Sequence, residues 1–327
     1  MEVVKFNRQN LIYQNRNLRQ TQVSCNKPSH LNNIQDSVSF SGRTPKAQIE
    51  IQKVKNSAKT LFEYISKNSK PADKYLEEVA SKSQILMLGE EHHNLNAKKF
   101  AISNLKALKK LGYTDVAVEV SSGLQKYVDL FIAGKITEHD LLKLTTYKLK
   151  DANEYNFIQL SCTVEMLKEC KKLGLNFHCI DVRDDKAANK LLDLISTKAK
   201  MSTIFNYLTS KDKQIFSNLS KRVFQKRPDA KVMIYIGNAH TLKAKTKDVQ
   251  HKMLRQFIDE TGKKVNSIHL QYHKEINEFI DTTSVQKQIG FPTTGSPIAD
   301  LAYTKSKTSL VEEPCDYYKH IDGMIVV

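Results

Sequence analysis

The sequence ILMLGEEH, residues 85–92, is an apolar run that ends in Gly-x-x-His, and the pattern returns in VMIYIGNAH, residues 232–240. Four or five consecutive apolar residues bounded by glycine are typical of a strand that is buried on both faces. Glycine permits a sharp exit from the strand, so the histidine three residues later can turn back over the strand end. The repeat therefore predicts two buried strands, with His92 and His240 at their carboxyl ends.

Three further apolar runs continue this alternation of strands and helices. They cover residues 116–118, which lead to Glu119, residues 175–180, which lead to Asp181, and residues 265–272. Helical patterns separate the strands, at 97–111, 123–173, 186–226 and 248–260. Strands that alternate with helices form parallel sheets through right-handed crossovers. The sequence predicts an α/β fold with a central, mainly parallel sheet flanked by helices, and with helical insertions at 123–173 and 186–226.

Polar residues at the ends of these strands form the candidate site, because the carboxyl ends of parallel strands share the edge of a sheet where ligands bind. The side chains expected at this edge are Glu90, His92, Glu119, Asp181 and His240. Imidazole accepts protons near neutral pH, and a neighbouring carboxylate fixes its tautomer. Such a group could activate water directly or hold a divalent cation that does so. The residues expected to contribute to binding are Gly89, His93, Asp181, Arg183, Gly237 and Asn238.

Each of these residues also has an ordinary structural interpretation. A single histidine or glutamate at a strand end is commonly solvated, and Asp181 could cap a following helix with Arg183 as its ion-pair partner. The repeated strand-Gly-x-x-His pattern favours function for His92 and His240. Three residues inside the predicted strands are expected to be packed rather than functional, namely Tyr235, His178 and His269.

The chain is strongly basic, with a formal net charge of +16 over 327 residues. Such a charge could serve nucleic acid or an anionic membrane, or it could be a solvated lysine surface. The basic residues are 43 Lys and only 8 Arg, although Arg makes the bidentate phosphate and guanine contacts. No motif interleaves aromatic and basic residues. We therefore expect a solvated surface and no nucleic-acid partner.

The cysteines and the N-terminal residues bear on the compartment. The five cysteines are odd in number and form no Cys-x-x-Cys, so we expect reduced thiols and a reducing compartment. The first residues contain no apolar core of a signal peptide, and no apolar run reaches the length of a transmembrane helix. A cytoplasmic protein is the default expectation, and secretion without an N-terminal signal peptide remains open.

The composition divides the chain into three parts. Residues 1–45, rich in Asn, Gln and Ser, are expected to be a disordered or loosely ordered leader. Residues 46–82 show helical periodicity, with Pro71 at the start of a second helix. Residues 83–327 form the α/β domain, in which Phe291-Pro292 indicates a turn and the closing IDGMIVV indicates a strand.

Four short segments carry a family resemblance. The strand-end motifs LGEEHHN and YIGNAH, Glu119 within VAVEV, and the closing YYKHIDGMIVV resemble the erythromycin esterase, ChaN-like and Tiki superfamily over about residues 84–327. The resemblance implies a sheet built from two related halves, with the site at the positions given above. The Gly-Glu-x-His spacing of ChaN-like members selects His92, whereas the Gly-Glu-x-x-His spacing of the esterases selects His93. We predict His92, because it mirrors His240.

The resemblance implies several activities, because members of the superfamily differ. Esterase-like members open an ester or lactone, Tiki-like members are metal-dependent proteases, and ChaN-like members bind haem. We predict a hydrolase for an ester, lactone or peptide, in which His92 is the base oriented by Glu90, while Glu119 and His240 orient water, polarise the carbonyl or share a metal with His92. The alternatives are a haem- or ligand-binding protein without turnover, and a toxin-like effector with residues 1–45 as its delivery segment.

Overall fold

The structure is a computed structural model. It describes residues 60, 62–92, 94–146, 154–182, 190, 194, 196–244, 251–271, 288–294, 296 and 317–327. These residues all belong to one compact unit, Lys53–Val327. The predicted leader and the candidates His93 and Arg183 lie outside the described residues.

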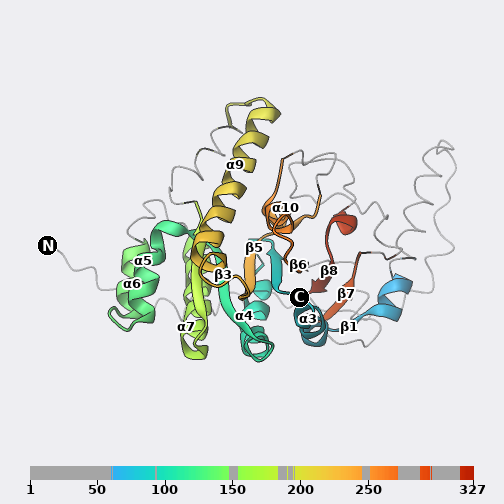
Figure 1. Ribbon diagram of the computed structural model, residues 1–327, viewed down its shortest axis with the longest axis horizontal. Helices are drawn as coiled ribbons and strands as arrows, with labels where there is room; N and C mark the ends of the chain where they lie inside the picture. Colours follow the sequence, from blue (N-terminus) through green and yellow to red (C-terminus); the bar gives the residue numbers. More distant parts are fainter. Residues whose placement is uncertain are drawn as a thin grey trace, which may run out of the picture. The chain divides into compact units, whose positions relative to one another are not determined.

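Eight strands of the described residues form one sheet, in the order β1-β7-β8-β6-β2-β5-β3-β4 (Figure 1). They are β1 (Lys70–Pro71), β2 (Ile85–Glu90), β3 (Tyr113–Ser121), β4 (Asn176–Asp181), β5 (Lys231–Gly237), β6 (Val265–Gln271), β7 (Ile289–Pro292) and β8 (Gly323–Val326). Neighbours from β8 to β4 are parallel, whereas β7 runs antiparallel to both β1 and β8. The predicted mainly parallel α/β sheet is therefore confirmed.

The two strands with the Gly-x-x-His motifs are neighbours in the sheet. β2 is buried along its whole length, and β5 is buried from Val232 onward. Side chains alternate between two cores, with Leu86 and Leu88 on one face and Ile85 and Met87 on the other. In the register of this pair, Glu90 lies opposite Gly237. Both motifs consequently leave the sheet at the same place.

Helices cover both faces of the sheet. The first core is closed by α3 (Ala72–Ser81), α4 (Leu95–Lys110), α5 (Gln125–Ile132), α6 (Glu138–Thr146) and α7 (Glu154–Leu173). The second is closed by α9 (Met201–Leu219), its π-helical continuation Ser220–Phe224, and α10 (Leu254–Asp259). The sequence predicted longer helical stretches. Gly134, with φ of 70°, interrupts one of them between α5 and α6, since this backbone conformation ends a helix.

The helix starts follow from local chemistry. The sequence predicted Pro71 in the first turn of this helix, and it lies one residue earlier, as the N-cap of α3, where its missing N–H costs no helical hydrogen bond. Asn94 caps α4 through its side-chain oxygen, which accepts the N–H of Ala97 at 3.2 Å. Residues 62–68 are also helical.

The connection between β2 and α4 is short. β2 ends at Glu90 and Asn94 already caps α4, so the chain passes through the His92 turn within a few residues.

The turn predicted at Phe291-Pro292 is wrong, because these residues lie in β7. Phe291 is buried and pairs with Met324 of β8. β1 pairs only with Ile289 and Gly290, so Pro292 has a single strand neighbour. Proline lacks the N–H that a second neighbour would need, and it is tolerated at such a position.

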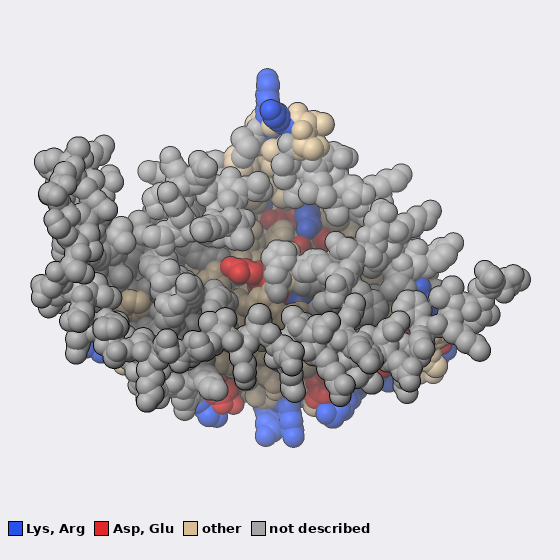
Figure 2. Space-filling model, turned by 180° about the vertical axis from the view of Figure 1, so that it is seen from behind, with Lys and Arg blue, Asp and Glu red and all other residues tan. Residues whose placement is uncertain are grey.

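Three findings concern the surface charges, the helix hydropathy and the thiols of the described residues. Where described residues are visible along the lower edge of Figure 2, Lys and Arg side chains lie beside Asp and Glu. None of the described helices is both long and apolar enough to span a membrane. Cys162, Cys170 and Cys179 are free thiols, and the last two are buried.

Candidate functional site at the carboxyl edge of the sheet

The candidate site lies where β2, β5, β3 and β4 end, beneath the helix α9. Glu90 and Asp181 are the last residues of β2 and β4, and Glu119 lies near the end of β3. His240 follows β5 within the short 3-10 helix Asn238–Thr241. The sheet order places these strands next to one another, so it gathers the predicted residues at one edge.

The buried Glu90 carboxylate holds the His92 ring. His92 Nδ1 lies 3.1 Å from Glu90 Oε1, and the Tyr235 hydroxyl donates a short hydrogen bond to Oε2. Lys98 Nζ lies 3.9 Å from Oε1. A carboxylate can only accept at this contact, so Nδ1 carries the proton and neutral His92 presents its lone pair at Nε2.

The His92 ring is accessible and basic. Its side chain is 57% exposed, although its carboxylate partner is buried. The hydrogen bond to Glu90 raises the pKa of His92 above its ordinary value, against the opposing effect of burial, and the charge of Glu119 adds to the rise. Because the ring is exposed and its pKa is raised, His92 has the properties of a solvent-accessible base. Burial lowers the pKa of the neighbouring Lys98.

Glu119 is the centre of a second group of charges. Its Oε1 lies 2.8 Å from Lys211 Nζ and 3.3 Å from His240 Nε2, and its Oε2 accepts the N–H of Gly237 at 2.9 Å. Burial disfavours the charge, but His240 and Lys211 outweigh it and hold the pKa of Glu119 well below its usual range. Glu119 is therefore ionised at neutral pH.

His240 is held between two carboxylates. Its Nε2 faces Glu119, and its Nδ1 forms a short contact with the buried Asp212 of α9. The His240 side chain is only 13% exposed. Burial lowers its pKa, but Asp212 and Glu119 more than compensate and raise it to about 10. His240 is thus an imidazolium at neutral pH, unlike the accessible His92.

Asp181 shares Lys211 with Glu119. Lys211 Nζ lies 3.5 Å from Asp181 Oδ1, which also accepts the N–H of Val182 at 2.8 Å. Burial raises the pKa of Asp181, Lys211 opposes the rise, and the negative charge of Glu119 adds to it. The pKa values of Asp181 and Glu119 are therefore displaced in opposite directions.

The glycines of the two motifs leave room for neighbouring side chains to approach the backbone closely. A Cβ on Gly237 would lie 3.3 Å from Glu119 Oε2 and from His92 Nε2, so its absence lets both side chains reach the strand end. A Cβ on Gly89 would lie 2.7 Å from Asn238 Oδ1 and would force a shift. Gly237 has an ordinary φ of −56°. Glycine is needed at position 237 because a side chain would not fit there, and not because the backbone adopts a conformation that only glycine allows.

The structure brings together most of the residues that the sequence singled out. The residues at the polar centre are Glu90, His92, Glu119, Asp181, Gly237 and His240. Asn238 packs instead against Gly89, and its buried Oδ1 has no hydrogen-bond partner among the described residues. His269 is buried, as predicted, and its Nε2 lies 2.6 Å from Thr241 Oγ1.

Four residues of this site were not identified from the sequence. Tyr235 is buried as predicted, but its hydroxyl binds Glu90. The other three, Lys98, Lys211 and Asp212, lie on helices. Lys98 shares a helical face with Ala101 and Leu105, so a lysine within an apolar stripe was the available signal.

The donor set does not fit a divalent metal. No group of three or more His, Cys, Asp or Glu among the described residues is arranged to hold one. Of the three candidate ligands, Glu119 is paired with the Lys211 ammonium, and both nitrogens of His240 face carboxylates. Glu90 occupies only Nδ1 of His92, so His92 could offer Nε2, but a single ligand does not make a site. The positive charge that a metal would bring is supplied here by Lys211 and the imidazolium.

Comparisons with known proteins define the class of fold. No protein-family model matches the chain, and no curated protein is detectably similar to it in sequence. Solved structures are similar. A protein from Bacillus cereus matches 83% of this chain and 97% of its own, with a TM-score of 0.53 and 11% identity. A variant of erythromycin esterase EreC in its open conformation matches 78% and 92%, with a TM-score of 0.51 and 10% identity.

A third structure, ChaN of Campylobacter jejuni with cofacial haem, matches 77% of this chain and 91% of its own, with a TM-score of 0.44 and 14% identity. At these identities the likenesses concern the fold. The match to EreC shows that the chain has the α/β fold of an erythromycin esterase. The strand-end motifs had implied this fold.

Proposed function

We propose that the protein is a hydrolase in which His92, held by Glu90, activates water to cleave an ester, lactone or peptide bond. The observation that carries the proposal is the Glu90–His92 pair. Its 3.1 Å contact fixes the proton on Nδ1, while Nε2 lies beside Gly237. Gly237 also binds Glu119, whose other oxygen contacts the cations Lys211 and His240. A general base next to fixed positive charge is the arrangement that water attack on a carbonyl needs.

In the proposed first step, Nε2 of neutral His92 takes a proton from water while the water oxygen bonds to the carbonyl carbon. The carbonyl oxygen gains negative charge, and the Lys211 ammonium, which has a third N–H beyond its contacts with Glu119 and Asp181, stabilises it. Ionised Glu119 keeps Lys211 and His240 protonated and in place, since it contacts them at 2.8 and 3.3 Å.

In the second step the carbonyl re-forms, the bond to the leaving oxygen or nitrogen breaks, and that atom must gain a proton. Asp181 suits this role because its pKa is raised, whereas the neighbouring Glu119 stays ionised. Two carboxylates with pKa values displaced in opposite directions are a common arrangement for acid and base roles. His92 then returns the proton that it took from water to Asp181 through solvent, and both groups are back in their starting states.

Esters and lactones are the first substrates to test, because an erythromycin esterase shares the fold. Wild type and His92→Ala are assayed on small-molecule esters, lactones and peptides. We expect the variant to lose on the order of a hundredfold or more in kcat/KM. His139→Ala is the matched control, because His139 is an exposed histidine on α6. Turnover by His92→Ala at the rate of the parent would exclude this mechanism.

A binding function without turnover is the second candidate, and the exposure of the His92 ring favours it. An accessible imidazole could become an axial ligand of haem. Haem titration of the wild type and of the His92→Ala, His240→Ala double variant tests this function. A Soret band that disappears in the variant supports haem binding, and an unchanged spectrum excludes it.

A further inference from the structure

A row of basic residues lies at the amino edge of the sheet, the edge opposite the candidate site. Five neighbouring parallel strands begin there, in the order β6-β2-β5-β3-β4. Their starts are level, because Ile85 of β2 lies opposite both Val232 of β5 and Val265 of β6. The start of β5 is likewise level with those of β3 and β4.

Each of these strands follows a helix end or a turn that carries one or two basic residues. In Figure 2 this edge is the lower one, where Lys and Arg side chains project. The nine residues, here called the basic rim, are Lys263 and Lys264 before β6, Lys82 before β2, Lys226 and Arg227 before β5, Lys109 and Lys110 before β3, and Lys171 and Lys172 before β4.

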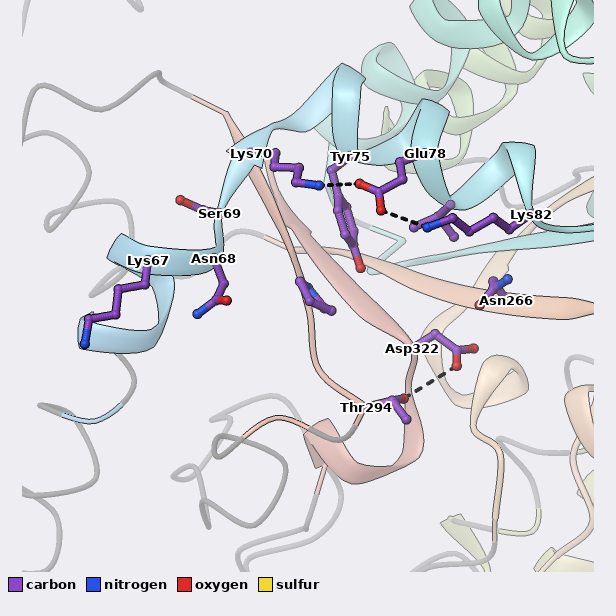
Figure 3. A pocket seen from close by; sticks show the side chains of 12 residues that line it. Lys67, Asn68, Ser69, Lys70, Tyr75, Glu78, Lys82, Asn266, Thr294 and Asp322 are labelled. Atoms are coloured by element: carbon purple, nitrogen blue, oxygen red, sulfur yellow. Dashed lines mark hydrogen bonds and ion pairs between the residues drawn. The ribbon is translucent and has the colours of Figure 1, made fainter.

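Most of the charge of the basic rim is not neutralised. Three members are paired with carboxylates, namely Lys82 with Glu78 at 2.9 Å (Figure 3), Lys172 with Glu169 at 3.1 Å, and Arg227 with Asp115 through a short contact. The other six are lysines without an ion pair to a described residue. Among the carboxylates of these helix ends and turns, only Asp229 lacks an ion pair with a described residue.

Three of the six unpaired lysines donate to backbone carbonyl oxygens. The acceptors are Leu173 for Lys109, Phe131 for Lys171, and Pro228 for Lys263. A carbonyl group has no net charge, so these contacts hold the ammonium groups at the edge and leave their charge in place. Six lysines against one carboxylate make the edge strongly positive.

Helix electrostatics explain this row only in part. A lysine in the last turn of a helix interacts favourably with the carboxyl end of the helix dipole. This accounts for the rim lysines of α4 and α7, which lie in the last turns of those helices. It does not account for Lys226, Lys263 or Lys264, which lie beyond the ends of their helices. A partner of opposite charge would account for all of them.

The charges suit an anionic lipid surface better than a nucleic acid. Nucleic-acid recognition relies on the planar fork of arginine, and the one arginine of the rim is engaged with Asp115. Lysine acts as a point charge, and clusters of about four to eight basic residues are attracted to membranes that carry anionic lipids. The composition favoured a solvated lysine surface, whereas the sheet places these lysines in one level row.

We propose that the basic rim binds the surface of a membrane that contains anionic lipids. Binding is electrostatic, with the lysine ammonium groups against the charged headgroups. A strand of six residues such as β2 spans about 20 Å, so the candidate site at its other end faces the solution and takes soluble substrates. The surface is independent of the proposed hydrolase, because no residue of the rim belongs to that site.

Sedimentation of the full chain with vesicles tests the proposal. One arm uses phosphatidylcholine alone, and the other uses equal parts of phosphatidylcholine and phosphatidylserine. We expect binding in the second arm only, and release at high salt, because salt screens exposed charges. Lys109→Gln, Lys110→Gln should lower the partition coefficient on the order of twentyfold, at about fivefold per lysine. Lys263→Gln, Lys264→Gln should have a similar effect, because this pair lies in the same row.

A matched control separates the rim from the net charge of the chain. Lys126→Gln, Lys213→Gln removes the same charge from two exposed lysines near the carboxyl edge, one at the start of α5 and one beside Asp212 on α9. It should bind as the wild type does. Equal weakening by the control and the rim variants overturns the proposal, as does equal binding, or no binding, in the two vesicle arms. Binding of single-stranded RNA in place of the vesicles would assign the rim to nucleic acid and overturn it as well.

Discussion

The two Gly-x-x-His turns have the same sequence pattern, yet their histidines differ in chemistry. His92 is 57% exposed and faces Glu90, whereas His240 is 13% exposed and lies between Glu119 and Asp212. The pKa of His92 is moderately raised, and that of His240 reaches about 10. A repeated motif therefore fixes where an imidazole sits, and the carboxylates around it decide whether it acts as a base or a fixed cation. For His92 this carboxylate is Glu90 of the motif itself, whereas β3 and α9 bring Glu119 and Asp212 to His240.

The largest expected difference between the two turns is in stability. His240→Ala should lower the free energy of unfolding by about 3 kcal/mol or more, because it leaves Asp212 and Glu119 as buried carboxylates with one cation fewer. His92→Ala should change it by less than about 1 kcal/mol, since the ring is exposed. Urea unfolding at pH 7 measures both. Equal losses in the two variants would remove the distinction between the turns.

The pH dependence of this stability has a definite sign. The folded-state pKa of His240 is raised to about 10, so its stabilisation is complete below the unfolded value of about 6.5 and is lost as pH rises through about 10. The stability difference between wild type and His240→Ala should therefore shrink as the pH rises from 7 to 10. A difference that stays constant over this range would show that His240 is not held as a cation.

The site residues that could be predicted from the sequence lie at strand ends, whereas most of those that could not be predicted lie on helices. Glu90, His92 and His240 follow apolar strands, whose pattern is local and whose carboxyl ends must meet at one edge. Lys211 and Asp212 lie on α9, where charged residues are ordinary on a solvated face. Their function depends on where α9 crosses the sheet, which is a tertiary property.

The fold shows the same division between local and tertiary information. Strand and helix types followed from periodicity, whereas the adjacency of β2 and β5 did not, because several helices and two strands separate them in the chain. β7 was missed because a Phe-Pro pair is also common in turns. Only its pairing with β8, with Phe291 opposite Met324, makes it a strand.

A smaller effect than the loss of stability is expected on kcat/KM, and it should depend on the leaving group of the substrate. If Asp181 donates the final proton, Asp181→Asn should lower kcat/KM on alkyl esters by about a hundredfold and on nitrophenyl esters by less than about threefold, because nitrophenolate leaves without a proton. Asn218→Ala is the control, since Asn218 supports the end of β4 through the carbonyl oxygens of Ile180 and Asp181. A structural effect alone would lower both rates equally.

The smallest effect should be a shift in the acidic limb of the pH–rate profile. A base must be neutral to act, so kcat/KM should fall as pH decreases through the raised pKa of His92, above about 6.5. Glu90→Gln removes the charge that raises this pKa and should move the limb to lower pH. Tyr235→Phe removes a hydrogen bond that disperses the charge of Glu90, and it should move the limb to higher pH.

The opposite directions make this test specific, because both variants change the same buried group, one at the carboxylate and one at its hydrogen-bond partner, and both should lower stability. Glu90→Gln also keeps the shape of the side chain, so His92 retains a nearby acceptor. Shifts of opposite sign would show that Glu90 acts on His92 through its charge. Shifts of the same sign, or no shift, would mean that the acidic limb of the pH–rate profile reports the titration of another group. His92 would then be excluded as the general base.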